Sequence, residues 1–374
     1  MIRVRVEDLR PGMKIAYPVF REDGSILLNK GVVLTENYIR RLFELGFESV
    51  FIEHELFEDI KVEEPVTLET KRKVQRILHE SVKKLQRGEL NSYQKIQSVI
   101  QELIEEVLDY PGVIFYLVQL GSKSDALFVH SVNVTVISLM IGKFQNLSHL
   151  QLKKLALGTL LHDVGKIRFP PEIFYKEGPL SEEERKIIRM HPVWSREIIQ
   201  KHAEYDFLAS VIALQHHERM NGSGYPYGLA GEEIHLLSRI CACADVYDAL
   251  TVDRPYRKRF SYSEALEYLM GNAGRLFDLQ VVTTMVRHIA PYPVGETVKL
   301  STGEIAVVIK LNEGLPIRPV VRVIKDREGR ELETPKDLDL MSELTVSIVD
   351  RPEEPPPPSS NMEEEIYLQE DFFD

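Results

Sequence analysis

Residues 160–166 read LLHDVGK, which is the strongest chemical signal in the chain. His162 and Asp163 are adjacent, and the apolar residues before them predict that both lie on a helix. Neighbours on a helix point about 100° apart, so this imidazole and this carboxylate can reach two metal ions or opposite sides of one. Lys166 follows one turn later on the same face. The stretch therefore predicts a metal site in a helical domain.

Further candidate ligands are spread over the same helical region, from residue 124 to about residue 289: His130, His191, His216, His217 and Asp245. Imidazole together with carboxylate suits Fe, Mn, Zn or Co, whereas Ca and Mg call for mostly oxygen ligands. Two such ions ~3.5–4 Å apart can ionise a water and stabilise the attacking and leaving oxygens of a phosphoester. Lys166 could neutralise a phosphate oxygen as charge builds up in the transition state.

Each candidate also has a plainer interpretation. A single histidine such as His130 or His191 is more often exposed or hydrogen-bonded in a core than bound to a metal. Paired histidines such as His216–His217 also occur on solvated faces. Asp245 is harder to dismiss, because it lies in the apolar stretch CACADVYDAL, and a buried carboxylate needs a compensating charge. The loop NGSGYP at residues 221–226 has glycines that allow close approach to a ligand, but in isolation it predicts an interhelical turn.

Taken together, these motifs resemble the HD-GYP subgroup of the HD phosphohydrolase superfamily. HDVGK at residues 162–166, HHERMNGSGYPYGL at 216–229 and ADVYDALTVDRPYR at 244–257 occur in the family's order. The resemblance covers residues 124 to about 289. It implies a helical domain, a bi- or trinuclear metal centre that is often iron, and hydrolysis of the bacterial second messenger cyclic di-GMP to pGpG or GMP.

The resemblance also implies a role for each matching residue. Asp163 and Lys166 would be catalytic, with Asp163 bridging two ions and Lys166 holding the scissile phosphate. The metal ligands would be His130, His162, Asp163, His191, His216, His217 and Asp245. The substrate would be bound by Lys166, Gly224, Tyr225, Pro226, Arg254 and Arg257. For the two arginines, a solvated basic face is the alternative interpretation.

One departure from the family's pattern concerns the number of metal ions. Some members carry an acidic residue one turn before the first histidine, where it supports a third ion, but this chain has Ala126 there. Asp125 is adjacent and would project in a different direction. We therefore predict two divalent transition metals rather than three, with iron expected first and manganese as the alternative.

Three functions remain open at this point. The leading hypothesis is a metal-dependent phosphodiesterase that hydrolyses cyclic di-GMP through a metal-bridging hydroxide in second-messenger signalling. The second is a metal-containing module that senses the dinucleotide with little turnover. The third is a hydrolase of this subgroup that acts on another cyclic dinucleotide.

The predicted fold class is mainly α, and composition divides the chain into five parts. We expect a small mixed α/β domain at 1–60, a connector of amphipathic helices at 67–123 that could also dimerise, and the helical HD-type domain at 124–290. A small β module follows at 291–350, with strands at 297–300, 305–311, 320–324 and 344–349. Residues 351–374 form a proline-rich, acidic tail that is expected to be disordered.

The overall composition predicts a cytoplasmic protein. The formal net charge of −12 argues against a broad nucleic-acid surface, so cyclic di-GMP is the expected partner rather than a polymer. Cys241 and Cys243 are predicted to be small buried residues of a protein in a reducing compartment. We see no uninterrupted apolar run of the ~18 residues that a membrane span needs, and therefore expect no membrane span. A homodimer, and a protein partner bound by the acidic tail or the N-terminal domain, are left open.

Overall fold

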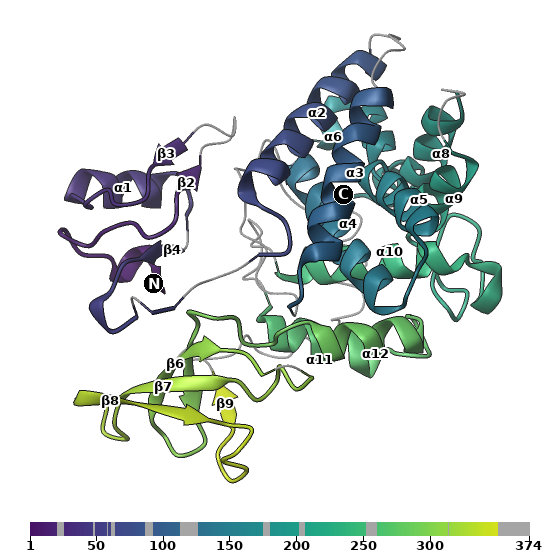
Figure 1. Cartoon of the computed structure of the whole chain (residues 1–374). Coiled ribbons are helices and arrows are strands. Elements are labelled where there is room, and N and C mark those ends of the chain that lie inside the picture. Colours follow the sequence, from purple (N-terminus) through teal and green to yellow (C-terminus); the bar gives the residue numbers. More distant parts are fainter. Residues whose placement is uncertain are drawn as a thin grey trace. The chain divides into compact units, whose positions relative to one another are not determined.

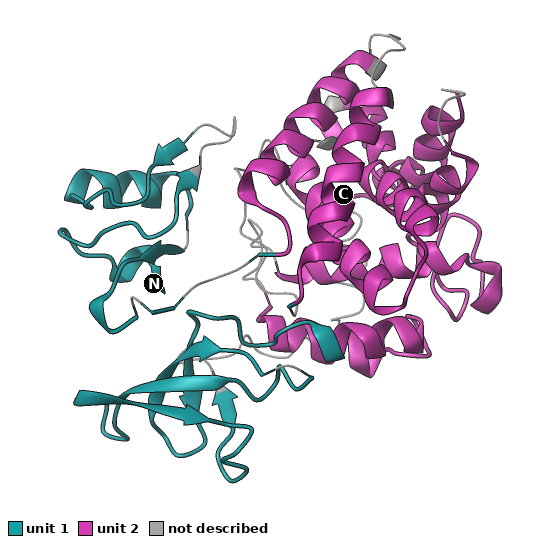
Figure 2. Ribbon diagram, viewed as in Figure 1, with its two compact units in different colours: residues 1–64, 112–125, 287–357 teal, residues 65–111, 126–286, 358–374 magenta. Residues whose placement is uncertain are grey.

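The computed structural model describes residues 1–20, 26–47, 49–57, 59–60, 64–86, 93–112, 126–174, 180–201, 206–251, 260–312 and 314–350. The chain divides into two compact units (Figure 2), the first of residues 1–64, 112–125 and 287–357 and the second of residues 65–111, 126–286 and 358–374. Arg254, Arg257 and the acidic tail lie outside the described residues, and the five predicted domain boundaries stay a prediction.

The N-terminal part of the first unit is a small mixed α/β structure (Figure 1). Strand β1 (Ile2–Arg5) pairs antiparallel with β4 (Ser49–Ile52), and β2 (Val19–Phe20) pairs with β3 (Ile26–Leu28). Single 3-10 turns lie at Val6–Asp8 (η1) and Glu55–Phe57 (η2). Helix α1 (Glu36–Glu44) begins after Thr35, whose side-chain oxygen accepts a hydrogen bond from the Tyr38 backbone N–H. This cap is the one expected from a threonine before an amphipathic run.

The C-terminal part of the first unit is a five-stranded antiparallel sheet in the order β8-β7-β6-β5-β9. Its strands are β5 (Thr297–Leu300), β6 (Ile305–Lys310), β7 (Val320–Lys325), β8 (Glu331–Asp339) and β9 (Ile348–Asp350). The first three follow the predicted strands closely. Strand β8 was not predicted from the sequence, because it lies at the edge of the sheet, is largely exposed and carries Pro335, which an edge strand tolerates.

The last predicted strand, 344–349, is wrong in its bounds, since β9 begins only at Ile348. Arg318 explains the difference. Its guanidinium donates hydrogen bonds to the carbonyl oxygens of Leu340, Glu343 and Val346, and so holds these residues as a loop. A contact from a distant part of the sequence therefore decides where the strand starts.

The second unit is helical, which confirms the predicted fold class. Its α-helices are α2 (Leu68–Gln86), α3 (Tyr93–Asp109), α4 (Ala126–Phe144), α5 (His149–Leu160), α6 (Pro171–Phe174), α7 (Glu182–Ile188), α8 (His191–Lys201), α9 (Phe207–Gln215), α10 (Leu236–Thr251), α11 (Tyr262–Gly271) and α12 (Leu279–His288). Short 3-10 turns lie at Val164–Arg168 (η4) and Gly231–Glu233 (η5). The apolar stripes of α2 and α3 are buried inside this unit, where both helices pack against α4.

Three helices of this unit begin with the same local device. Ser148, Ser181 and Ser261 precede α5, α7 and α11, and each serine side chain accepts a hydrogen bond from the backbone N–H three residues later. The side chain of the Gln or Glu at that position accepts a hydrogen bond from the backbone N–H of the serine. Two of the free N–H groups at each helix start are thereby satisfied.

Helix α4 is the central helix of the unit and packs against α5 and α10. Its segment Leu127–Phe144 is long and apolar enough to cross a membrane by length and composition, but 67% of it is buried inside the unit. Such a helix is apolar all round because protein surrounds it. Helix α10 beside it carries Cys241 and Cys243, which are buried free thiols, as predicted.

Arg322 links the two parts of the first unit. Its guanidinium donates to Asp337 at 2.7 Å and to Asp59 at 2.9 Å, and lies 5.9 Å from the centroid of the Phe57 ring. Phe57 itself belongs to the core of the β module. The residues after β4 are thereby fastened to the sheet.

We expect the substitution Arg322→Ala to destabilise this junction by about 1 kcal/mol, because two partly exposed carboxylates lose their partner. Hydrogen–deuterium exchange of peptides that span β7 and β8 measures the effect. Arg330→Ala is the matched control: Arg330 is exposed and pairs locally with Asp326 and Glu328, so no change is expected. Equal exchange in the two variants would contradict the role given to Arg322.

Candidate metal centre

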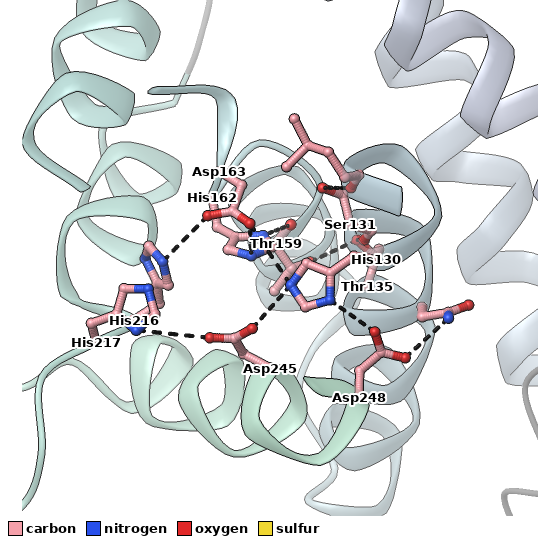
Figure 3. A network of polar contacts seen from close by, with 12 residues as sticks. His130, Ser131, Thr135, Thr159, His162, Asp163, His216, His217, Asp245 and Asp248 are labelled. Atoms are coloured by element: carbon pink, nitrogen blue, oxygen red, sulfur yellow. Dashed lines mark hydrogen bonds and ion pairs between the residues drawn. The ribbon is translucent and has the colours of Figure 1, made fainter. Parts of the chain in front are cut away.

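The seven predicted ligands lie on, or directly after, five helices of the second unit. His130 lies within α4, Asp245 lies within α10, and His191 is the first residue of α8. The remaining four follow the last residues of two helices, namely His162 and Asp163 after α5 and His216 and His217 after α9. Figure 3 shows His130, His162, Asp163, His216, His217 and Asp245 turned toward one another. Every one of the seven is buried except His130, whose side chain is 12% exposed.

The prediction that His162 and Asp163 lie on a helix is wrong. Helix α5 ends at Leu160, and both residues lie in the turn before η4. The turn brings the Asp163 carboxylate back toward the neighbouring ring, with 3.0 Å between His162 Nε2 and Asp163 Oδ2. A continuous helix would have pointed the two side chains apart.

Gly165 makes this turn possible. A Cβ atom at this position would lie 2.2 Å from the carbonyl oxygen of His191 and 2.6 Å from the backbone nitrogen of Ser195. The Gly165 N–H donates to Ser195 Oγ at 2.8 Å. The backbone of η4 therefore lies directly on α8, and this contact brings the LLHDVGK stretch to His191.

The Asp163 carboxylate lies at the centre of the cluster. Its Oδ1 is 3.4 Å from His191 Nε2 and 3.7 Å from His216 Nε2. Its Oδ2 is 2.6 Å from Lys166 Nζ, 3.0 Å from His162 Nε2 and 3.7 Å from His130 Nε2. One carboxylate thus faces two different groups of imidazoles, one with each oxygen.

A second carboxylate, that of Asp245, lies across the cluster (Figure 3). It is 3.0 Å from His130 Nε2 and 4.0 Å from His217 Nδ1. The other nitrogen of His130 lies 2.8 Å from Asp248, whose second oxygen accepts a hydrogen bond from Asn133. Burial lowers the pKa of His130, but hydrogen bonds to Asp245 and Asp248 outweigh burial and raise it well above its usual value.

Asp248 is not among the site residues predicted from the sequence. It follows Asp245 by three residues, so both lie on one face of α10, and this spacing was the available signal. A carboxylate that orients a histidine from behind is a common partner of metal-binding imidazoles.

Hydrogen bonds to the backbone fix three of the rings. The Nδ1 atoms of His162, His191 and His216 lie 2.6–2.8 Å from the carbonyl oxygens of the residues three positions earlier, Thr159, Ile188 and Ala213. A neutral imidazole that donates from Nδ1 has its lone pair on Nε2. Each of these rings therefore presents a lone pair to the centre.

This arrangement places lone pairs close together. His191 Nε2 lies 3.2 Å from His216 Nε2 and 3.1 Å from His217 Nε2. His162 Nε2 and Asp163 Oδ1 are buried and make no hydrogen bond. Buried acceptors that face one another without a donor are costly, and a cation between them removes the cost.

The protonation states of His191, His216 and Asp163 agree with this interpretation. Burial lowers the pKa of His216 to about 4 and that of His191 well below its usual value, so both rings are neutral at pH 7. For Asp163, burial would raise the pKa, but interactions with neighbouring groups, among them the Lys166 ammonium, outweigh burial and hold the pKa well below the usual value. Neutral imidazoles and an ionised carboxylate are the forms that bind metal ions.

Within the described residues, three groups have ligand atoms that all lie within 4.8 Å of one another. They are His191, His216 and His217; His130, His162 and Asp245; and His162, Asp163 and His216. Imidazole nitrogens with a few carboxylate oxygens fit a divalent transition metal and fit Mg²⁺ or Ca²⁺ poorly. The residues present therefore fit such a centre.

The predicted substrate loop lies beside this cluster. The Tyr225 ring stacks on the His217 ring at 4.6 Å between centroids, with 21° between the planes. Its backbone N–H donates to the His217 carbonyl oxygen. A Cβ atom on Gly224 would lie 2.4 Å from this same oxygen and 2.5 Å from the backbone nitrogen of Arg219. Position 224 therefore requires glycine, because the backbone of residues 217–219 lies too close to leave room for a side chain.

These features define the class: a helical domain that gathers histidines and aspartates around a buried candidate metal centre. Residues 118–281 match the HD domain family, and residues 297–354 match the KOW domain associated with the HD domain. The first match covers most of the helical unit and confirms the resemblance to the HD superfamily seen in the sequence.

Three curated relatives illustrate the likeness. A cyclic di-GMP phosphodiesterase of Pseudomonas aeruginosa is 35% identical over 60% of this chain and 54% of its own length. A cyclic di-GMP phosphodiesterase response regulator of Xanthomonas campestris is 39% identical over 40% of this chain and 39% of its own. A 3'3'-cGAMP-specific phosphodiesterase of Vibrio cholerae is 39% identical over 50% of this chain and 43% of its own length. The chain spans about half the length, or less, of these relatives.

We expect Gly224→Ala to lower the free energy of unfolding by about 2 kcal/mol, because the added methyl group has no room between two backbone segments. Gly271→Ala is the matched control, since a Cβ atom there meets nothing within 4 Å and the residue ends α11. Urea denaturation of the full chain gives both values. Similar stability of the two variants would show that the loop around Gly224 does not pack closely on residues 217–219.

Proposed function

We propose that this protein is a metal-dependent phosphodiesterase that hydrolyses cyclic di-GMP to pGpG or GMP in bacterial second-messenger signalling. The observation that carries the proposal is the buried Asp163 carboxylate, which faces one group of imidazoles with each oxygen and is paired with Lys166. The names of the Pseudomonas and Xanthomonas relatives support the choice of substrate.

The residues that would hold the ions are the seven that converge in the centre: His130, His162, Asp163, His191, His216, His217 and Asp245. When bound, two ions lower the pKa of a water and neutralise charge on the phosphate. Asp163 would bridge the ions, since its two oxygens face different histidines. We propose two ions rather than three because Ala126, not an acid, stands one turn before His130; iron is the first choice and manganese the second.

Lys166 would serve the phosphate. Its ammonium group is buried and lies 2.6 Å from Asp163 Oδ2, so its position is fixed before any substrate arrives. A preorganised positive charge stabilises the phosphoryl oxygens most when their negative charge is greatest, in the transition state. The same charge keeps Asp163 ionised.

The substrate would lie against the loop that contains Gly224, Tyr225 and Pro226. Support comes from the stacking of Tyr225 on the ligand His217. We also assign the dinucleotide phosphates to Arg254 and Arg257, on the strength of the sequence motif alone.

A hydrolase of another cyclic dinucleotide is the second candidate. The similarity to the 3'3'-cGAMP-specific phosphodiesterase of Vibrio cholerae favours it. The two candidates share the same metal centre, so they differ in the groups that contact the bases.

We further propose a cytoplasmic location, because the buried free thiols of Cys241 and Cys243 suit a reducing compartment. A homodimer and a protein partner for the tail or the N-terminal domain stay predictions.

The test uses metal-loaded full-length protein, incubated separately with cyclic di-GMP and 3'3'-cGAMP, with products separated by chromatography. We expect Asp163→Asn to lose bound metal and activity together. Lys166→Met should keep the metal and turn over ~10²–10³-fold more slowly, because it removes only a charge that acts in the transition state. Metal content is measured by mass spectrometry.

Lys186→Met is the control for the lysine substitution, since Lys186 is exposed on α7. Full activity in Asp163→Asn would refute the bridging role. Binding of cyclic di-GMP without turnover in the wild-type protein would show a sensor, and turnover of 3'3'-cGAMP alone would favour the second candidate.

A further inference from the structure

Glu218 directly follows the two histidines of the HHE sequence, yet it belongs to none of the three groups of candidate ligands. Its side chain is nevertheless buried, with 2% of its surface exposed. A buried carboxylate needs hydrogen-bond donors to offset its lost hydration. The structure shows where Glu218 finds them.

Both carboxylate oxygens of Glu218 accept hydrogen bonds from the backbone of one loop. The Tyr227 N–H donates to Oε1 at 2.8 Å, and the Leu229 N–H donates to Oε2 at 2.9 Å. Burial raises the pKa of Glu218, and backbone hydrogen bonds from residues 227–229 oppose this rise. Hydrogen bonds to a charged acceptor are stronger than those between neutral groups.

These bonds join the two sides of the loop formed by residues 218–229. On the near side, Glu218 is covalently linked to His217, whose carbonyl oxygen accepts from Tyr225. On the far side, Tyr227 and Leu229 follow the Tyr225–Pro226 pair. Tyr225 is thus held between its bond to His217 and the anchored residues after it.

The position of the Tyr225 ring depends on this closure. The ring stacks on His217 and lies 6.4 Å from the His191 ring, measured between centroids, so it forms a wall beside two candidate ligands. If residues 227–229 moved away, the ring would lose the support of the chain that follows it.

We propose that Glu218 is a positioning residue: its carboxylate clamps residues 227–229 and thereby holds Tyr225 against His217 on the substrate side of the metal centre. The identity of the substrate rests on the function proposed above, whereas the clamp itself does not. In this proposal Glu218 contacts neither the substrate nor the metal ions, and it acts through Tyr225.

The test compares Glu218→Gln and Glu218→Ala in metal-loaded, full-length protein. Glutamine keeps the volume but replaces one acceptor with an NH₂ group that faces a backbone N–H, and alanine removes both acceptors. We expect hydrogen–deuterium exchange of peptides spanning residues 225–229 to increase in the order wild type, Gln, Ala. Metal content should stay unchanged, because Glu218 is not a ligand.

For hydrolysis of cyclic di-GMP, we expect Glu218→Gln to raise KM about tenfold, with kcat within about threefold of wild type, since one charged hydrogen bond is lost away from the reacting atoms. Glu233→Gln is the matched control. Glu233 Oε2 accepts from the Ala230 N–H at the end of the same loop and is exposed, so neither KM nor the exchange of residues 225–229 should change.

Three results would overturn the proposal. Unchanged exchange at residues 225–229 in both Glu218 variants would show that no clamp exists. Loss of metal in Glu218→Gln would show that the residue supports the ligands instead of the loop. A fall in kcat at constant KM would place Glu218 in the chemical step. If wild-type protein hydrolyses no cyclic dinucleotide, the proposed function fails, while the exchange and metal measurements still decide the clamp.

Discussion

An ionised carboxylate has to be kept inside a helical core, and much of the local structure around Asp163 serves this requirement. Lys166 supplies the opposite charge at 2.6 Å, three residues along the chain. Helix α5 stops at Leu160, and Lys166 reaches the carboxylate from η4, the 3-10 turn that follows. The η4 turn requires a glycine at position 165, because its backbone lies directly on the backbone of α8. The pairing of this buried charge, the end of α5, the glycine and the packing of η4 on α8 therefore belong to one local arrangement.

The fold class was predictable from the hydrophobic pattern of the sequence. The errors, at β8 and at the start of β9, occur where this pattern does not determine the structure. Strands β5, β6 and β7 fill the core of the β module with buried apolar residues, so their sequences carry the signal. Strand β8 pairs only at the sheet edge and has no fully buried residue, so its sequence does not alternate. The start of β9 depends on Arg318, which lies about thirty residues earlier in the chain.

The candidate ligands were visible in the sequence because histidine and aspartate in apolar surroundings are unusual and form recognisable motifs. What the sequence could not show is which partner each side chain finds. Asp248 acquires its role from His130, 118 residues away, and Glu218 acquires its role from the backbone of a folded loop. Both residues stand in quoted motifs, but their partners are defined only by the tertiary structure. Arg254 and Arg257 lie outside the described residues.

The seven converging side chains are scattered over more than a hundred residues, from His130 to Asp245, and no single helix holds a complete set. An ion that binds them consequently binds the assembled helices and has little affinity for the unfolded chain. By mass action, its binding energy adds to the stability of the whole helical unit, and the apparent melting temperature rises with the free metal concentration. The lifetime of the protein in the cell would then increase with the supply of the metal, independently of any reaction at the centre.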